Sequence, residues 1–231
     1  MSNSKILRVK NLMKLAIVAC VFGIATNVSG QYLWLKGGLN SGTQIAKDNQ
    51  LTYSDDFTNR IGFHAGVIAG AGVGPIAGEG GILVSTRGYN YSFEEELNGS
   101  IYKFSGYTNL TYIDVPLNLK LRARLGGSGV FLNTGPVFSF GIGGKAYSKT
   151  EEDGVETSSD EVDIKWGDAD DSDFKQMDIG YALGAGVELG KISLSAQYIW
   201  GLTNLATSTL DGEEVKNRTL QFTLGFQLFD L

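Results

Sequence analysis

The sequence of 231 residues predicts an all-β protein, an eight-stranded, antiparallel, up-and-down transmembrane β-barrel with short periplasmic turns and long extracellular loops. Three observations predict this fold. Apolar residues alternate with polar or small ones in eight segments, and no segment keeps the 3.6-residue period of an amphipathic helix. The connections between these segments are alternately short and long, as in outer-membrane barrels. A leader typical of exported proteins precedes the first segment.

Residues 1–30 have the layout of a cleaved signal peptide. Four basic residues and no acid lie in the first fourteen positions, an apolar run follows over 15–26, and Val28-Ser29-Gly30 offers small residues for cleavage before Gln31. A run of about 12 residues is too short to span a bilayer, which needs roughly 20. We therefore expect a signal peptide at 1–30 and one barrel domain over 31–231.

Composition excludes several classes of protein. Without the four leader cations the chain holds 15 basic and 25 acidic residues, a net charge of −10, which excludes a nucleic-acid binder. The single cysteine, Cys20, lies in the leader and loosely resembles a lipoprotein cleavage site, but apolar residues continue past it. Cleavage after Gly30 would leave a chain without disulfides or thiol chemistry.

The eight strands are expected over residues 32–44, 60–73, 78–91, 113–123, 130–145, 178–189, 192–202 and 219–228. The last is the most regular, because Leu220, Phe222 and Leu224 alternate with Gln221 and Thr223. The first and third are the least regular. Short turns are expected at 72–75, 125–129 and 190–191, and long polar loops near 46–57, 93–107, 149–173 and 204–216.

The choice between a membrane barrel and a soluble, lipocalin-like barrel depends on which face could be a core. One face is mostly Leu, Ile, Val and Phe, and the other is Gly, Ser, Asn and a few charges. The apolar face is too bulky for an eight-stranded interior and too large to expose to water, whereas lipid accommodates it. Of the 25 acids, 20 lie in the predicted loops. Acid is thus nearly excluded from the predicted spans, as expected from the cost of charge on a lipid face.

The order of several short motifs resembles the PorT-like outer-membrane β-barrel family of Bacteroidetes. These motifs are Lys36-Gly-Gly-Leu-Asn40, Gly62-Phe-His-Ala-Gly66, Tyr112-Ile-Asp-Val-Pro-Leu117, Gly135-Pro136, Asp178-Ile-Gly180 and Gly184-Ala-Gly-Val-Glu188. The resemblance covers essentially the whole mature chain. It implies an eight-stranded barrel without a catalytic site, and for the family's namesake an association with protein secretion. The chain departs from the barrel-insertion signal by ending in Phe229-Asp-Leu231 and not in an aromatic residue.

Charged residues on the predicted inward faces are candidates for a barrel-interior network. Their mixed signs favour ion pairs that fill the interior over a conducting path, because eight strands leave room only for side chains. His64 is the only histidine, and a barrel enzyme would need it beside a serine or a carboxylate. No compact set of that kind is identifiable, so we expect no enzyme. The candidate network residues are Lys36, Arg60, His64, Glu79, Arg87, Asp114, Lys120, Arg122, Lys145, Asp178 and Glu188.

The acidic segment 149–173 is the one loop with a possible function of its own. Asp168, Asp170, Asp171 and Asp173 are closely spaced oxygen donors of the kind that calcium prefers. The spacing is not that of an EF-hand, however, and a solvated, self-repelling loop is the alternative. We keep both interpretations, with bridging of lipopolysaccharide phosphates as the role that weak divalent-cation binding would serve.

The sequence therefore predicts a non-enzymatic, integral outer-membrane protein with a structural or interaction role at the cell surface. The alternatives are a component of a secretion or transport assembly, a small pore and a barrel enzyme. The expected partners are outer-membrane lipid and lipopolysaccharide, the barrel-assembly machinery during insertion, and proteins that contact the loops. No cofactor and no nucleic acid are expected.

Overall fold

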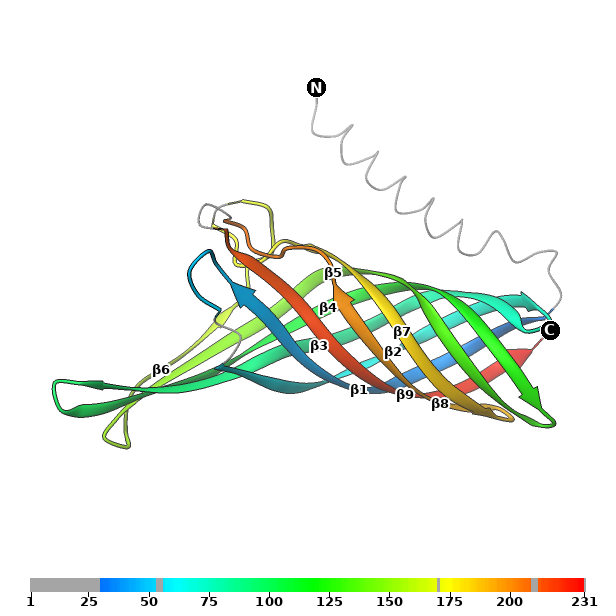
Figure 1. Ribbon diagram of the computed structural model, residues 1–231, viewed down its shortest axis with the longest axis horizontal. Coiled ribbons are helices and arrows are strands. Elements are labelled where there is room, and N and C mark those ends of the chain that lie inside the picture. The colour runs from blue at the N-terminus through cyan, green and yellow to red at the C-terminus, as the bar shows by residue number, and fades with distance from the viewer. Residues whose placement is uncertain (1–29, 53–55, 170, 209–211, 231) are drawn as a thin grey trace, which may run out of the picture.

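The computed structural model describes residues 30–52, 56–169, 171–208 and 212–230. Eight strands in this part of the chain form a closed antiparallel barrel, because β4 pairs with β5 at one end of the sheet order β4-β3-β2-β1-β9-β8-β7-β5 (Figure 1). The predicted fold class is confirmed. A ninth strand, β6, pairs only with β5 and lies outside the ring. The strands are β1 (Gln31–Lys47), β2 (Phe57–Val73), β3 (Ile76–Leu97), β4 (Ser100–Leu125), β5 (Ser128–Glu152), β6 (Val155–Asp163), β7 (Met177–Leu189), β8 (Ile192–Gly201) and β9 (Glu214–Asp230).

Two-residue turns join the strands at the end of the barrel where β1 begins and β9 ends (Figure 1). Gly74, Gly126 and Gly190 adopt positive φ angles of 62°, 65° and 60° in the turns β2–β3, β4–β5 and β7–β8. Tight hairpin turns need this left-handed conformation, which glycine adopts without a steric penalty. The predicted short turns are therefore confirmed, and by the rule for outer-membrane barrels they mark the periplasmic end.

The alternation read from the sequence separates two faces of the barrel wall. Outward-pointing Leu119, Phe222 and Leu224 expose 51%, 54% and 56% of their surface, and their inward-pointing neighbours Lys120 and Gln221 are buried. A continuous band of exposed Leu, Ile, Val and Phe would be unfavourable in water but suits the hydrocarbon of a bilayer. Among the described residues, no helix is long and apolar enough to cross a membrane.

Two hairpins extend the wall far beyond the barrel at the end opposite the short turns (Figure 1). Residues 92–97 of β3, 100–105 of β4, 145–152 of β5 and 155–163 of β6 form a four-stranded antiparallel sheet, called here the projecting sheet. The sequence predicted loops at 93–107 and 149–173, and that prediction is wrong for 93–107 and for 149–163. Left-handed Asn98-Gly99 and Asp153-Gly154 close the two hairpins, and these dipeptides are strong hairpin signals.

Residues 171–176, before β7, pack against residues 202–208, after β8, at the extracellular mouth of the barrel. The Trp166 ring meets Tyr112 edge to face at 5.1 Å, and its Nε1 donates to the carbonyl oxygen of Gly143 at 3.1 Å. Leu205 is fully buried, and its carbonyl oxygen accepts a hydrogen bond from the Lys175 amide at 3.0 Å. These contacts cover the open end of the wall with apolar side chains.

An arginine at the centre of the lipid-facing band should destabilise the barrel, and the same change on the projecting sheet should not. We expect Leu224→Arg to lower the free energy of unfolding by about 2–4 kcal/mol, the cost of a cation near the bilayer midplane. Ile101→Arg is the matched control, because Ile101 is 52% exposed but lies beyond the barrel. Urea titrations in phospholipid vesicles measure both values. Equal destabilisation by the two changes would contradict the lipid-facing assignment.

Candidate functional site

A cluster of charges around Glu79 lies in the barrel interior toward its periplasmic end. The Glu79 carboxylate accepts hydrogen bonds from Lys120 Nζ at 2.8 Å and from the Tyr32 hydroxyl at 3.0 Å, and Lys36 Nζ lies 3.5 Å away. Lys120 Nζ also contacts Glu188 Oε1 at 2.7 Å. Because β1, β3, β4 and β7 supply these groups, the cluster joins strands from different sides of the barrel. Glu79 and Lys120 are each only 1% exposed, so water screens their attraction weakly.

Aromatic rings surround the ammonium group of Lys120. Its Nζ lies 4.1 Å from the centre of the Phe131 ring, and 5.7 Å and 5.8 Å from the rings of Tyr32 and Trp34. The guanidinium of Arg122 lies over the Tyr32 ring at 5.0 Å. A cation over aromatic faces is stabilised electrostatically without a further anion. The rings therefore complete the environment of Lys120 and close off space around it.

A second cluster lies nearer the extracellular end, centred on Arg87 and Asp114. Arg87 Nη2 contacts Asp114 Oδ1 at 2.5 Å and donates to Ser139 Oγ at 2.9 Å, and Ser85 Oγ donates to Asp114 Oδ2 at 2.5 Å. The Arg87 guanidinium lies 4.1 Å from the centre of the Tyr112 ring. Both members of the ion pair are at most 3% exposed. A buried pair of this kind is stable only when additional hydrogen bonds support it. Ser85 and Ser139 supply two, and Arg87 Nε has no hydrogen-bond partner among the described residues.

Asp178 joins the second cluster through amide side chains. Asn217 Nδ2 donates to Asp178 Oδ2 at 2.8 Å and contacts the Tyr112 hydroxyl at 3.0 Å. Gln44 Nε2 in turn donates to Asn217 Oδ1 at 2.9 Å. The chain of contacts runs from Arg87 through the Tyr112 ring to Asp178, so that β1, β3, β4, β7 and β9 share one network.

His64 lies between the two clusters and bonds only neutral groups. Its Nδ1 lies 2.7 Å from Asn40 Oδ1 and its Nε2 lies 3.0 Å from Thr223 Oγ1. The Asn40 amide also donates to the carbonyl oxygens of Phe63 and Thr86 at 3.0 Å and 2.8 Å. His64 is 2% exposed. Its two ring nitrogens are thus occupied by partners that fix its orientation, and neither partner is the serine or carboxylate that a hydrolytic site would need.

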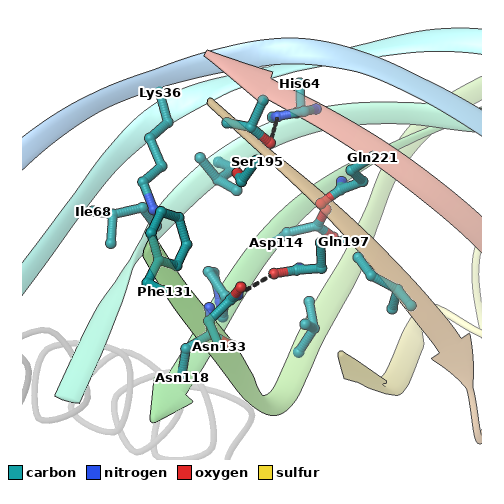
Figure 2. A pocket seen from close by; sticks show the side chains of 15 residues that line it. Lys36, His64, Ile68, Asp114, Asn118, Phe131, Asn133, Ser195, Gln197 and Gln221 are labelled. Carbon is teal, nitrogen blue, oxygen red and sulfur yellow. Dashed lines mark hydrogen bonds between the residues drawn. The ribbon is translucent and has the colours of Figure 1, made fainter. Parts of the chain in front are cut away.

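A cavity of about 40 Å³ separates the two clusters (Figure 2). Lys36, His64, Asp114 and Asn133 line it, and the Asn133 amide donates to Gln197 Oε1 at 2.5 Å. A water molecule needs roughly 10–15 Å³ of such volume, so the cavity has room for a few waters. Ligand pockets measure about 300–1,000 Å³, so this cavity is too small for an organic ligand.

Comparison with known protein families identifies the family of the chain. A family model described as "Outer membrane protein beta-barrel domain" matches residues 29–207. The chain belongs to this family. It is therefore an integral outer-membrane β-barrel protein, as the sequence predicted.

Several solved structures are similar to this outer-membrane barrel. One is Ail, the attachment invasion locus protein of Yersinia pestis, whose structure was solved in complex with the heparin analogue sucrose octasulfate. Ail is 14% identical to this chain. The match covers 87% of this chain and 99% of Ail, with a TM-score of 0.33. Neisserial surface protein A is 10% identical over 86% of this chain and 98% of that chain, with a TM-score of 0.40. No curated protein matches the chain significantly.

The eleven predicted network residues of this family member fall into distinct places. Eight contribute to the two clusters and the cavity between them, and Arg122 packs on Tyr32 beside the first cluster. Arg60 lies apart, where its Nη1 donates to Asn90 Oδ1 at 2.9 Å and its guanidinium covers the Tyr107 ring. Lys145 also lies apart: its side chain is 57% exposed and pairs with Glu161 on the projecting sheet. The eight are Lys36, His64, Glu79, Arg87, Asp114, Lys120, Asp178 and Glu188.

The sequence analysis missed the neutral and aromatic members of the interior. Tyr32 and Trp34 point inward on β1 although they are large and partly apolar, which is why this strand read as irregular. The remaining signal was the alternation of these two rings with Leu33 and Leu35, in phase with the inward Lys36. The other missed members are Asn40, Gln44, Tyr112, Phe131 and Asn217.

The proposed cation ligands are only partly placed by the structure. Asp170 lies outside the described residues. Asp173 Oδ2 accepts a hydrogen bond from the Lys165 amide at 2.8 Å and so shapes the local turn. Within the described ranges, no group of three or more His, Cys, Asp or Glu residues is arranged to hold a metal ion.

Neutralising Glu79 should destabilise the barrel far more than neutralising an exposed glutamate. Glu79→Gln keeps the shape of the side chain but leaves Lys36 and Lys120 short of a buried counter-charge, and we expect a loss of about 3–5 kcal/mol. Glu94→Gln is the control: Glu94 is 60% exposed and lies 3.6 Å from Lys103, so a loss under about 1 kcal/mol is expected. Denaturant titrations in detergent measure both. Similar losses for the two variants would show that the cluster does not hold the barrel together.

Proposed function

We propose that this protein is a non-enzymatic surface protein whose barrel is an anchor and whose projecting sheet is the part that meets other molecules. The observation that carries the proposal is the length of three adjacent strands. β3, β4 and β5 contain 22, 26 and 25 residues, whereas a barrel strand crosses the membrane in about 9–11 residues. The additional residues of these strands form an ordered, solvent-exposed sheet outside the membrane. A barrel whose only role was to span the membrane would not require such a sheet.

The filled interior supports an anchor in place of a pore. The two charge clusters occupy the interior, and the cavity between them has a volume of about 40 Å³. Trp166 and Leu205 pack over the extracellular mouth. Eight-stranded barrels have interiors that side chains fill. His64 supports a non-enzymatic role, because its ring nitrogens contact Asn40 and Thr223 and the side chain is almost inaccessible to solvent.

The finer family assignment, to the PorT-like barrels of Bacteroidetes, rests on motifs that serve the interior. The interior clusters contain Lys36 of the first motif, Asp114 of Tyr112-Ile-Asp-Val-Pro-Leu117, and Asp178. Asn40, also of the first motif, holds His64 between them. Residues of this kind specify a barrel and its packing. They therefore support the fold of that family more than a share in its secretion function, which remains the alternative to a surface role.

The expected contacts of such an anchor follow from its surfaces. The apolar band meets membrane lipid, and the barrel-assembly machinery meets the chain during insertion. Lipopolysaccharide would contact the wall and the projecting sheet at the outer leaflet. Weak cation binding by Asp168, Asp170, Asp171 and Asp173, with bridging to lipid phosphates, is an additional proposal that calcium titration of the intact protein would test.

Site-specific photo-crosslinking in living cells separates a surface role from a place in a secretion assembly. A crosslinking amino acid at Asp160 on β6 reports contacts outside the cell, and one at Lys191 in the β7–β8 turn reports contacts in the periplasm. A surface role predicts protein adducts at 160 and few at 191. The control replaces residues 149–159 by Asn-Gly, which keeps Ser148 opposite Asp160 but removes the tip of the hairpin. Adducts at 191 alone would favour the secretion assembly.

The purified barrel should not conduct ions. In planar bilayers we expect no discrete conductance steps, because the two charge clusters occupy the interior and the cavity between them is only about 40 Å³. A porin reconstituted in the same bilayers is the positive control, and a shift in gel mobility on boiling shows that the sample is folded. Reproducible unit steps that disappear after boiling would reject the anchor proposal in favour of a small pore.

A further inference from the structure

Strand β6 gives the projecting sheet a free edge. It is hydrogen-bonded to β5 and to no other strand of the described chain, and all nine of its residues are exposed. Natural sheets usually protect such edges with charged side chains, above all lysine, with proline, a strong bulge or a covering loop, because a free edge pairs readily with another extended chain. β6 reads Val-Glu-Thr-Ser-Ser-Asp-Glu-Val-Asp and contains neither lysine nor proline. Its one irregularity lies close to the Asp153-Gly154 turn, between Thr150 and Glu151 of the partner strand.

The register identifies the main-chain groups that point away from β5. The Ile164 amide donates to the Gly144 carbonyl oxygen at 3.0 Å, which continues the pairing of Asp163 with Lys145. Hydrogen-bonded pairs alternate in an antiparallel ladder. The amides of even-numbered β6 residues from 158 to 162 therefore face β5, and those of Ser159, Glu161 and Asp163 face outward. At these three alternate residues, the main-chain donor and acceptor groups are therefore available to a further strand.

Charge decides which chain fits the open edge. Residues 92–105 and 145–163 hold ten acids and three lysines. All three lysines are already engaged across strands: Lys103 with Glu94 at 3.6 Å, Lys145 with Glu161, and Lys149 with Glu156 at 3.5 Å. Hydrogen bonds from Lys145 and from the Tyr107 hydroxyl lower the pKa of Glu161, which keeps that carboxylate ionised. A second copy of β6 would bring like charges together, whereas a basic strand would place opposite charges side by side.

We propose that the free edge of β6 binds an extended, basic peptide segment of another protein as an added β-strand. Main-chain hydrogen bonds to Ser159, Glu161 and Asp163 supply the affinity, and Lys or Arg side chains of the segment pair with acids such as Asp160. Asp160 has no ion-pair partner among the described residues and stands between two of the outward-facing positions. This inference rests on the proposed surface role and names the chemistry of the partner.

The test uses synthetic probes on the mature chain folded in detergent. The first probe is a labelled nine-residue peptide of alternating Lys and Thr with blocked termini. A second has Glu in place of Lys, and a third keeps every Lys but carries proline in place of three Thr residues, so that it has the charge without the ability to pair. Fluorescence anisotropy measures the affinity of each. We expect binding of the first probe only, weakened by added salt because the charges are exposed.

Two substitutions at one position report on the edge itself. Ser159→Pro removes an outward amide without touching the ladder to β5, and we expect it to weaken binding of the first probe by about tenfold or more. Ser159→Ala is the matched control and should bind within about twofold of the unchanged protein. The boiling-dependent gel shift confirms that each barrel is folded. As a second variant, replacement of residues 149–159 by Asn-Gly removes the outward position at 159 altogether and should abolish binding.

Each outcome decides the proposal. Equal binding of the proline-containing probe, equal binding by Ser159→Pro, or no binding by the unchanged protein would overturn it. Failure of the edge and failure of the surface role remain distinguishable. Crosslinked adducts at position 160 that persist in Ser159→Pro would retain the surface role and reject strand addition. Absence of adducts at 160 would reject the surface role, whatever the peptides show.

Discussion

The narrow interior of an eight-stranded barrel is the constraint on which the rest of this structure depends. Side chains that point inward have little access to bulk water: Lys36 and Glu188 are 15% and 17% exposed, and Glu79 and Lys120 are 1% exposed. The polar ones must therefore find most of their partners inside. Glu79 shows how the chain meets this requirement: one carboxylate contacts two lysines and a tyrosine hydroxyl from β1 and β4, and Lys120 carries the network on to β7. The charges that neutralise one another in the interior come from different strands, so they meet only when the sheet closes. A strand that slipped by one residue would place its charges in lipid.

Glycines on the inward face provide the space for this arrangement. A Cβ atom at Gly70 would lie 2.4 Å from the Tyr32 ring, one at Gly186 2.5 Å from the Phe131 ring, and one at Gly141 2.4 Å from the Trp166 ring. These three rings thus lie against positions where only glycine fits without displacement. Other strand glycines meet the backbone of a neighbouring strand, since a Cβ atom at Gly62 would lie 2.2 Å from the Thr86 carbonyl oxygen.

The sequence was sufficient to predict which residues form the wall of the barrel, but not which side chains contact one another in its interior. The outward positions of β2, β4, β5, β7, β8 and β9 follow a strict alternation imposed by lipid, so they could be assigned residue by residue. Which inward charges meet is a matter of three-dimensional proximity: Lys36 and Glu79 are 43 residues apart, and Lys120 and Glu188 are 68 apart. Residues that no charge marks, such as Asn217 or Tyr32, were missed for the same reason. The hairpins were missed because polar composition outweighed the turn signals Asn98-Gly99 and Asp153-Gly154.

The projecting sheet owes its order to the barrel. Among the described residues it has no second layer and no enclosed core. Its visible support is cross-strand pairing, such as the stacked rings of Phe93 and Phe104 at 5.2 Å, and Tyr107 and Tyr147 stack at 5.4 Å where it joins the barrel. An isolated two-stranded hairpin is marginal in water, but here the two hairpins pair with each other through β4 and β5. In addition, β3, β4 and β5 emerge from a wall whose register is already fixed. The barrel thereby holds an exposed strand edge in its extended conformation before any partner arrives. Since that ordering precedes binding, a chain added at this edge loses less free energy to conformational entropy than one that pairs with a flexible loop.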